Sequence, residues 1–523
     1  MNIRLRIYDT KEGSQTVHCK IWNEHRVYLR SDSDNMPIPI ENPQQHIHFE
    51  DRLAGHFPHV PTQGQAELIH AFSRYLFSDQ PRCTLMVRGY AGTGKTTSVG
   101  AFVRALREIG APTVLLAPTG RAAKVMQSYA GLSASTIHRQ IYRTTKSSDG
   151  GTAFGLAPNM KENAVFIVDE ASMIGESGGR SEKDGFQTRS LLDDLMEYVF
   201  NGAGCRLVLV GDDAQLPPVG HAESPALNEE KMRREFDLTV ATIRLTDVVR
   251  QELDSGILSN AHQLRLQIDA QHEGFPQLDL SGHKDIERLD GLELQEQIED
   301  LYARYGEDQV VIITRSNKRA NQFNQQIRNR VLWREESIEA GDRLMVVRNN
   351  YFWLSGQEAI PTTLIANGDT LIVQKITKRF ERYGAPFAEA EVRLADFPNH
   401  PTFEVCLHLS ALHTDSPSIP PSEIQALQAA VAEDYIHLGS RTAVKKAVSM
   451  DPCFQALQVK FAWAITCHKA QGGQWPAVIV DQGYLQDDMI QIELLRWFYT
   501  AFTRAQEKLF LLNFSPSFFS EEK

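Results

Sequence analysis

The chain has 523 residues, of which 42% are hydrophobic and 23% charged, and its formal net charge is −12. This length is too great for one hydrophobic core and predicts about three to four domains. The sequence shows no signal pattern and no membrane-length apolar run, so we expect a soluble, cytoplasmic protein without a membrane partner. Its six cysteines are scattered without a C-x-x-C pair, which argues against a disulfide framework or a cysteine-based zinc site. The acidic charge is only a weak argument against a nucleic-acid partner, because a translocating protein needs a local groove, not a basic surface.

Residues 1–60 alternate apolar and polar positions around Leu5 and again around Leu29. This alternation predicts short strands, in an N-terminal extension to which we assign no role. Four histidines lie near its end: His46, His48, His56 and His59. They could bind a metal or be ordinary solvated histidines, and the lack of a common helical register favours the second interpretation.

Residues 88–97 match the phosphate-loop pattern G-x-x-x-x-G-K-[ST]. They follow the apolar run Cys83–Val87, where a strand should lead into such a loop, and precede apolar residues at helical spacing that stop at Gly110. The glycines allow backbone N–H groups to surround phosphates, Lys95 reaches the β and γ oxygens, and the Thr96 hydroxyl can bind Mg²⁺. We therefore predict binding of ATP with Mg²⁺. The predicted nucleotide contacts in this loop are Gly92, Thr93, Gly94, Lys95, Thr96 and Thr97.

From Pro61 to about residue 245, short apolar runs alternate with amphipathic segments. This pattern is typical of a parallel sheet that is covered on both faces. The runs are Val114–Ala117, Ala164–Val168 and Cys205–Val210. A second set of such runs is Val310–Ile313, Ala477–Val480 and Leu509–Leu512. We therefore predict two nucleotide-binding α/β domains, each a doubly wound parallel sheet.

Polar side chains follow two of these runs directly. Asp169 and Glu170 come after the run that ends at Val168, and Gln215 lies just after the run that ends at Val210. A Mg²⁺-bound phosphate needs a carboxylate, and hydrolysis needs an oriented water, so we assign Asp169 to the metal and Glu170 to the water. Because neighbouring strand ends share one crevice, we expect Gln215 to reach the γ-phosphate.

Residues 335–455 have a different pattern of apolar and polar residues from the α/β segments around them. Alternating stretches such as Arg343–Val347 predict a small all-β insertion. Within it, Ser422 and Gln425 have the spacing of a capping box, which predicts a helix that runs through Val431.

The order of these segments resembles the superfamily 1B DNA helicases of the RecD-like and Dda-like kind. Besides the phosphate loop and the acidic pair, the likeness rests on Pro61–Gln65, Leu116–Ala123, Ser135–Arg139, Leu245–Gln251, Trp463–Gly472 and Tyr499–Ala505. The resemblance implies two RecA-like P-loop NTPase domains, with a pin hairpin in the first and a small SH3-like insertion in the second. The implied boundaries are 1–60 for the extension, 61–245 for the first domain with its pin at about 141–162, 246–334 and 456–523 for the second domain, and 335–455 for the insertion.

The resemblance also implies an ATP-dependent DNA helicase that works as a monomer. It would move 5′ to 3′ on single-stranded DNA and unwind duplex or forked DNA. Gln65 is implied to read adenine and Gly473 to contribute to the nucleotide site. Arg250 is implied to face the γ-phosphate, and Arg504 to act as an arginine finger, both from the second domain. The implied strand contacts are Pro118, Thr119, Thr136, His138, Thr466, His468 and Lys469.

Several alternatives stay open at this point. Gln474 stands where relatives usually carry an acid, and His138 could be a core histidine bonded to backbone. An RNA-directed motor would use the same ATP site with contacts to 2′-hydroxyls. A non-motor scaffold has no chemical need for the intact set of site residues, and a small-molecule P-loop kinase needs no second α/β domain.

Overall fold

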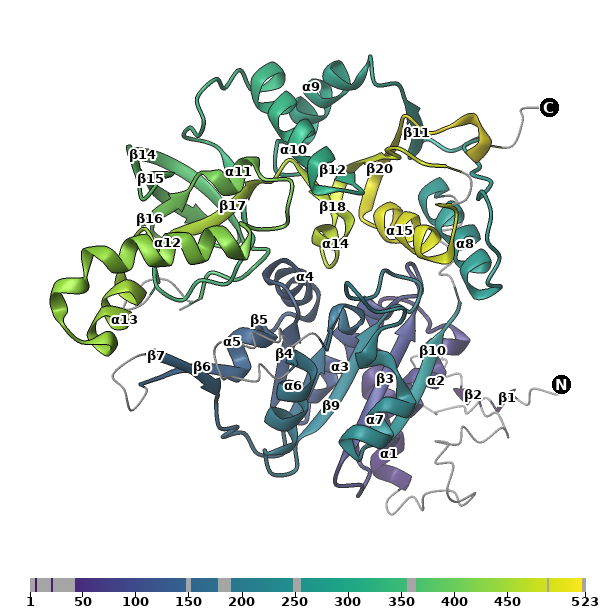
Figure 1. Ribbon diagram of the computed structural model, residues 1–523. Helices are drawn as coiled ribbons and strands as arrows, with labels where there is room; N and C mark the ends of the chain where they lie inside the picture. The colour runs from purple at the N-terminus through teal and green to yellow at the C-terminus, as the bar shows by residue number, and fades with distance from the viewer. Residues whose placement is uncertain are drawn as a thin grey trace.

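The computed structural model describes the following residues: 5–6, 20–21, 43–146, 152–176, 190–247, 255–354, 364–486 and 489–519. Two parallel sheets with helices around them and one closed β barrel form most of the described chain, which also contains two antiparallel strand pairs (Figure 1). The first α/β domain fills the lower half of the view, the second the upper half, and the barrel lies at the left. The predicted α/β fold with two parallel sheets is confirmed. The insertion contains the predicted strands as a barrel, but it also contains helices, so the expectation of an all-β insertion is wrong.

The first α/β domain contains a six-stranded sheet in the order β10-β3-β9-β8-β4-β5, and every neighbouring pair is parallel. Its strands are β3 (Cys83–Gly89), β4 (Thr113–Ala117), β5 (Ala134–Thr136), β8 (Val165–Val168), β9 (Arg206–Gly211) and β10 (Thr239–Leu245). The apolar runs predicted as strands account for β4, β8 and β9. The carboxyl ends of these strands meet at one edge, which brings the phosphate loop, the acidic pair and the Gln215 loop together.

Helices cover both faces of this sheet. The helices on one face are α1 (Pro43–Gly55), α2 (Gln63–Leu76), α3 (Lys95–Glu108) and α4 (Gly120–Ala130), and those on the other are α5 (Ile137–Ile141), α6 (Leu191–Phe200) and α7 (Glu229–Phe236). Two short 3-10 helices, η1 (Ala171–Met173) and η2 (Pro225–Leu227), follow the acidic pair and precede α7. Burial of alternate strand residues against both helical layers holds the domain together.

Helix α1 comes from the predicted N-terminal extension but packs into the first domain. Phe49 and Leu53 are buried, and the Phe49 ring lies edge-on to Phe102 of α3 at 6.2 Å. Phe102 in turn stacks on Phe72 of α2 at 3.9 Å. This part of the extension therefore completes the hydrophobic core behind the phosphate loop. Ahead of it, β1 (Leu5–Arg6) and β2 (Lys20–Ile21) form a two-stranded antiparallel sheet.

The four N-terminal histidines bond different groups. His46 contacts Ser73 Oγ at 3.0 Å, His48 accepts from Arg52, His56 lies 3.1 Å from Glu108, and His59 contacts the Val60 carbonyl. These separate partners favour the interpretation as ordinary histidines over a shared metal site.

An antiparallel ribbon leaves the first domain between α5 and β8. It consists of β6 (Tyr142–Lys146) and β7 (Thr152–Leu156), which pair from Tyr142 with Leu156 to Lys146 with Thr152. The ribbon projects from the domain edge below the barrel in Figure 1. A hairpin is therefore present where the pin is predicted, near residues 141–162, and its tip residues 147–151 lie outside the described ranges.

The second α/β domain has a five-stranded parallel sheet in the order β11-β20-β19-β12-β18. Its strands are β11 (Ile286–Leu289), β12 (Val310–Thr314), β18 (Ala464–Thr466), β19 (Trp475–Asp481) and β20 (Ala505–Leu512). Its helices are α8 (Gly256–Asp269), α9 (Leu294–Tyr305), α10 (Asn317–Gln326), α14 (Cys467–Ala470) and α15 (Ile492–Phe502), with the π-helix η4 (Ile327–Val331) after α10 and the 3-10 helix η7 (Pro516–Phe518) after β20. Helices α9 and α10 pack on one face, and α8, α14 and α15 pack on the other, which faces the first domain.

The insertion in the second domain is a closed barrel of five strands. They are β13 (Arg343–Val346), β14 (Thr370–Arg382), β15 (Ala385–Leu394), β16 (Phe403–His408) and β17 (Leu457–Phe461). Between β16 and β17 the chain forms α11 (Ser410–His413), α12 (Pro421–Asp434), the 3-10 helix η5 (Ile436–Leu438) and α13 (Arg441–Met450). The helix predicted through Val431 is present as α12. The predicted capping box at Ser422 is wrong, because α12 begins one residue earlier, its N-cap is Pro420, and no side chain caps it.

Asn324 of α10 ties the barrel to the second sheet. Its Oδ1 accepts from the backbone N–H groups of Trp463 and Ala464 at 3.1 and 2.8 Å. Its Nδ2 donates to the carbonyls of Phe461 and Ala464 at 3.1 and 2.8 Å. The last barrel strand and the first residue of β18 are therefore fixed by one buried side chain. Within the described ranges, every helix is too short or too polar to serve as a membrane span.

Candidate active site

The phosphate loop connects β3 to α3 in the predicted way. Gly92 and Gly94 both have φ of +77°, a conformation that glycine adopts without the strain a Cβ would cause. Gly94 is the N-cap of α3 and provides no side-chain cap, so the first N–H groups of the helix are donors for an anion. Lys95 Nζ donates to the carbonyls of Gly89 and Tyr90 at 2.6 and 2.8 Å, which holds the ammonium group beside the loop. The loop therefore has the geometry that phosphate binding requires.

The acidic pair lies at the end of β8. The Asp169 carboxylate accepts from the Tyr129 hydroxyl at 2.7 Å and from the N–H of Glu170 at 2.8 Å. Arg504 of the second domain lies 3.8 Å from the Glu170 carboxylate and is only 4% exposed. Burial raises the pKa of Glu170, and the Arg504 guanidinium opposes that shift. The structure thus brings Arg504 to the residue that we assign to the water.

Tyr499 of α15 joins the phosphate loop to the loop after β9. Its hydroxyl accepts from the N–H of Ala91 at 2.8 Å and donates to Asp212 at 2.7 Å. Asp212 lies 3.7 Å from Lys95 Nζ, so the bridge reaches the lysine of the phosphate loop. Arg496, one turn earlier in α15, donates to the carbonyl of Asp213. Helix α15 therefore contacts both the phosphate loop and the loop after β9.

Gln215 is buried at this interface, and its Oε1 has no hydrogen-bond partner among the described residues. Ser172 Oγ is likewise buried and unpartnered. Both side chains line a cavity of about 400 Å³ whose other walls include Arg496 and Asp269 of the second domain. Gln215 therefore has a free acceptor at the junction of the two domains, close to Asp212.

Gln65 lies at the first turn of α2. Its Oε1 accepts from the N–H of Thr62 at 3.0 Å, and Thr62 Oγ1 accepts from the N–H of Gln65, which completes a capping box. Its Nε2 is buried without a partner in the described structure. A free amide donor remains for a ligand at the position predicted to read adenine. Arg250, predicted to face the γ-phosphate, lies outside the described residues.

The predicted strand contacts lie at the carboxyl ends of β4, β5 and β18. Pro118 and Thr119 follow β4, and the Thr119 hydroxyl caps α4 through the N–H of Ala122 at 3.2 Å. Thr136 ends β5 and caps α5, while Thr466 ends β18 and leaves α14 without a side-chain cap. A Cβ added to Gly472 would lie 3.3 Å from Thr119 Oγ1, so the contacts of the two domains adjoin each other.

His138 and Lys469 are half-buried members of this group, as is His468. Burial lowers the pKa of His138, and its ring, 5.7 Å from the Tyr142 ring, has no backbone hydrogen bond within the described ranges. Burial also lowers the pKa of Lys469 to about 8, and its ammonium group donates to Asn367 of the barrel. The barrel therefore reaches a predicted strand contact of the second domain.

Gly473 lies between the two domains. A Cβ at this position would be 2.6 Å from the Trp475 ring and 3.0 Å from Arg121 of α4, so only glycine fits. The Arg121 guanidinium lies 3.7 Å from the centre of the Trp475 ring and donates to the carbonyl of Gln474 at 3.0 Å. Arg504 donates to the carbonyl of Gly473 at 3.3 Å, which places this predicted nucleotide contact next to the arginine.

Sequence reasoning missed Tyr129 and Tyr499, which the structure places at the site, and Gln471, whose amide donates to the carbonyl of Leu216 next to Gln215. Tyr499 and Gln471 lie inside motifs that carry the family likeness, so their position was a usable signal. Tyr129 lies in α4, 40 positions before its partner Asp169, and no local pattern connects the two.

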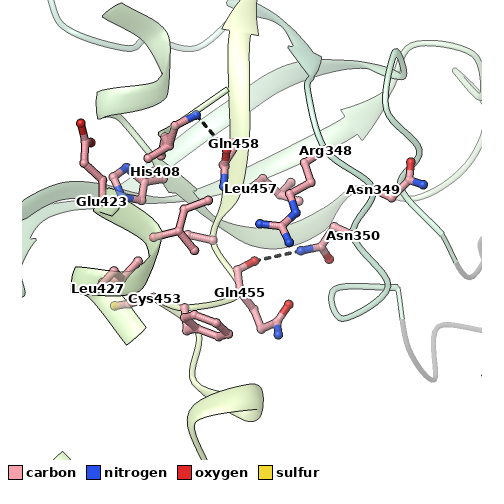
Figure 2. Close-up of a pocket in the computed structure, with 14 residues that line it drawn as sticks. Arg348, Asn349, Asn350, His408, Glu423, Leu427, Cys453, Gln455, Leu457 and Gln458 are labelled. Carbon is pink, nitrogen blue, oxygen red and sulfur yellow. Dashed lines mark hydrogen bonds between the residues drawn. The ribbon is translucent and has the colours of Figure 1, made fainter. Parts of the chain in front are cut away.

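A second cavity, of about 140 Å³, lies between the barrel and α12 (Figure 2). Gln458 Oε1 accepts from the N–H of Ile419 at 3.2 Å, and Asn350 donates to the carbonyl of Gln455 at 2.9 Å, which fixes its walls. None of the predicted site residues lines it.

Two family models match the chain: the AAA domain over residues 62–282 and the UvrD-like helicase C-terminal domain over residues 461–512. The first contains the phosphate loop, the acidic pair and Gln215, and the second contains Gln471, Tyr499 and Arg504. The two models thus cover both sides of the site described above.

The ATP-dependent RecD2 DNA helicase of Deinococcus radiodurans is 34% identical over 183 residues, which are 34% of this chain and 21% of the relative. The ATP-dependent DNA helicase dda of Enterobacteria phage T4 is 27% identical over 168 residues, which are 32% of this chain and 34% of the relative. The chain therefore matches between a fifth and about a third of the length of these curated relatives. Among solved structures, the Pif1 helicase from Bacteroides in complex with ADP-AlF3 and ssDNA has a TM-score of 0.44 and 14% identity, over 89% of this chain and 95% of that one. The two family models and the curated relatives support the assignment of the chain to the superfamily 1B helicases.

Proposed function

We propose that the chain is an ATP-dependent DNA helicase that moves 5′ to 3′ on single-stranded DNA and unwinds forked duplexes. One observation carries the proposal: a single nucleotide pocket is completed by side chains from both α/β domains. Arg504 lies 3.8 Å from Glu170, and Tyr499 bonds the N–H of Ala91 at 2.8 Å. Because both halves of the pocket come from one chain, a monomer is sufficient for the activity.

The side chains of the pocket divide the chemistry among them. Lys95 and the first amides of α3 hold the β and γ phosphates. Glu170 orients the attacking water, and the free amide oxygen of Gln215 can accept a hydrogen bond from that water, while its amide N–H group contacts the γ-phosphate. Arg504 neutralises negative charge on the transferring phosphoryl group, an effect worth about 10³–10⁵ in rate for comparable arginine fingers.

The residues also fit a divalent metal. The Thr96 hydroxyl is exposed at the phosphate loop, and the Asp169 carboxylate stands at the end of β8. Hydroxyl and carboxylate oxygens are the ligands that Mg²⁺ prefers, so we assign these two residues to it. When bound, Mg²⁺ supplies charge neutralisation on the β and γ oxygens.

The position of Arg504 between the two domains links ATP hydrolysis to domain movement. Arg504 can act only when the second domain closes on the first, so nucleotide binding favours closure and hydrolysis favours opening. The strand contacts occur in both domains, at Thr119 and Thr136 in the first and at Lys469 in the second. If each domain grips the strand in turn, each cycle moves the protein along it. The ribbon formed by β6 and β7 would then part the duplex ahead.

ATP hydrolysis with and without single-stranded DNA tests the proposal. We expect turnover to rise strongly with oligo(dT) and less with oligo(U), and Lys95→Ala to abolish it. In a strand-displacement assay with ATP, duplexes with a 5′ single-stranded tail should be unwound and duplexes with a 3′ tail should not. Equal stimulation by RNA, or no stimulation by either polymer, would exclude a DNA motor.

A further inference from the structure

The peptide groups on either side of Leu216 are held by the second domain. The N–H of Leu216 donates to Thr500 Oγ1 at 2.8 Å. Its carbonyl accepts from Gln471 Nε2 at 2.7 Å. All three residues are buried, so water does not compete for these bonds. Leu216 directly follows Gln215, whose amide oxygen is free at the interface.

The two residues that hold Leu216 belong to different functional segments. Gln471 ends the segment that begins at Thr466, and lies two residues after Lys469, a predicted strand contact. Thr500 lies in α15, where its carbonyl accepts from Arg504 Nε at 3.0 Å. One short stretch of backbone therefore connects to the strand-contacting segment on one side and to the arginine of the pocket on the other.

We infer that Gln471 and Thr500 are positioning residues that transmit strand binding to Gln215 through the backbone of Leu216. This inference rests on the proposed DNA-dependent ATPase function. A strand that contacts His468 and Lys469 shifts the segment in which Gln471 lies. Because the Gln471 amide is bonded to the Leu216 carbonyl, that shift moves the backbone that carries Gln215. Both positioning residues are buried against Leu216, so we assign them no direct contact with nucleotide or strand.

The hydrogen bonds of Thr500 fix the N–H side of Leu216 to α15. Thr500 Oγ1 also donates to the carbonyl of Arg496 at 2.7 Å, so its hydroxyl is fixed within α15 and cannot rotate away. The N–H of Leu216 belongs to the peptide group that it shares with Gln215, so a shift of Leu216 and α15 relative to the first domain moves that peptide group. Such a movement changes where the Gln215 side chain points.

A matched pair of variants at Thr500 separates this role from packing. Thr500→Val keeps the volume and removes the hydroxyl, whereas Thr500→Ser keeps the hydroxyl and removes a methyl group. The measurement is the ratio of ATPase turnover at saturating oligo(dT) to turnover without DNA, together with KM for ATP and the melting temperature. We expect the ratio to fall at least about fivefold in Thr500→Val through kcat, and to stay within about twofold of wild type in Thr500→Ser. Equal ratios in both variants would overturn the inference.

Gln471→Met tests the hydrogen bond to the Leu216 carbonyl, because methionine has a similar length and lacks the amide donor. We expect the stimulation ratio to fall at least about fivefold at saturating oligo(dT), with the affinity for the oligonucleotide within about twofold of wild type. If the affinity falls instead and stimulation is restored at high DNA concentration, Gln471 is a strand contact and the relay is wrong. If wild type itself shows no stimulation by DNA, the proposed function fails, and that result is distinct from either variant outcome.

Discussion

The Tyr499 hydroxyl donates to the Asp212 carboxylate at 2.7 Å across the boundary between the two α/β domains. The same oxygen accepts the N–H of Ala91 at 2.8 Å. Burial raises the pKa of Tyr499 well above its ordinary value, so the hydroxyl keeps its proton and remains a donor at any working pH. One neutral side chain of the second domain therefore satisfies two buried groups of the first.

Tyr499→Phe should lower both stability and turnover. The ring keeps its packing, but the N–H of Ala91 and one oxygen of Asp212 lose their partner, which costs about 1–3 kcal/mol for a buried group. We expect a lower free energy of unfolding in urea and a reduced kcat for ATP. Tyr484→Phe is the control, because Tyr484 is 75% exposed, and it should change neither quantity. Normal turnover in Tyr499→Phe would show that the bridge has no role in the pocket.

Arg504→Ala should separate nucleotide binding from hydrolysis. Lys95 and the loop amides remain, so binding of a non-hydrolysable ATP analogue should stay near the wild-type affinity. Hydrolysis should fall by about 10³–10⁵ because the charge on the transferring group is no longer neutralised. Single-turnover hydrolysis and analogue titration measure the two effects. Arg107→Ala, an exposed arginine at the end of α3, should leave both unchanged, and normal hydrolysis in Arg504→Ala would refute the arginine-finger assignment.

Gln65→Glu should weaken the preference for ATP over other nucleoside triphosphates. Glutamate can still accept from the N–H of Thr62, as Gln65 Oε1 does at 3.0 Å, but it lacks the free amide donor. A two-pronged contact of glutamine to adenine is worth about 1–3 kcal/mol, so the KM for ATP should rise by about tenfold or more. Turnover assays with ATP, GTP and CTP measure the preference. An unchanged preference would show that Gln65 only caps α2.

The affinity for single-stranded DNA should fall as the pH rises above about 8. In the free protein, burial lowers the pKa of Lys469 to about 8, so its ammonium group loses its proton over this range. A phosphate favours the protonated form, so binding above this pH takes up a proton, and each unit of pH weakens binding further. Titrations between pH 7 and 9.5 should show this decline in wild type and a flatter profile in Lys469→Gln. Lys284→Gln, at an exposed site outside the predicted contacts, should follow wild type; identical slopes in all three proteins would exclude Lys469 as the titrating contact.

The sequence predicts the parts of this fold whose signals are local. Apolar runs bounded by polar residues identify β4, β8 and β9, and the glycine pattern identifies the phosphate loop. The short strand β5 escapes prediction, because its three residues, Ala134–Thr136, include two polar ones and gain their place from neighbouring strands. Helix α1 escapes for a similar reason, since Phe49 and Leu53 acquire a partner only once α2 and α3 have formed.

The residues of the candidate site also divide into those that a local motif predicts and those that depend on tertiary packing. Lys95, Asp169, Glu170 and Gln215 follow strands in short motifs and can be assigned from chemistry. Tyr129 and Asn324 act on residues 40 and 140 positions away, and nothing in their local sequence indicates the partner. Contacts of this kind depend on how elements stack in space, which no short motif encodes.

Asn324 has a mechanical consequence. Only two residues separate the end of β17 at Phe461 from the start of β18 at Ala464, and Asn324 pins that joint on both sides. The barrel therefore cannot swing as a loosely tethered appendage. A force that a nucleic acid exerts on the barrel would therefore pass through this rigid connection to Thr466, two residues after Ala464.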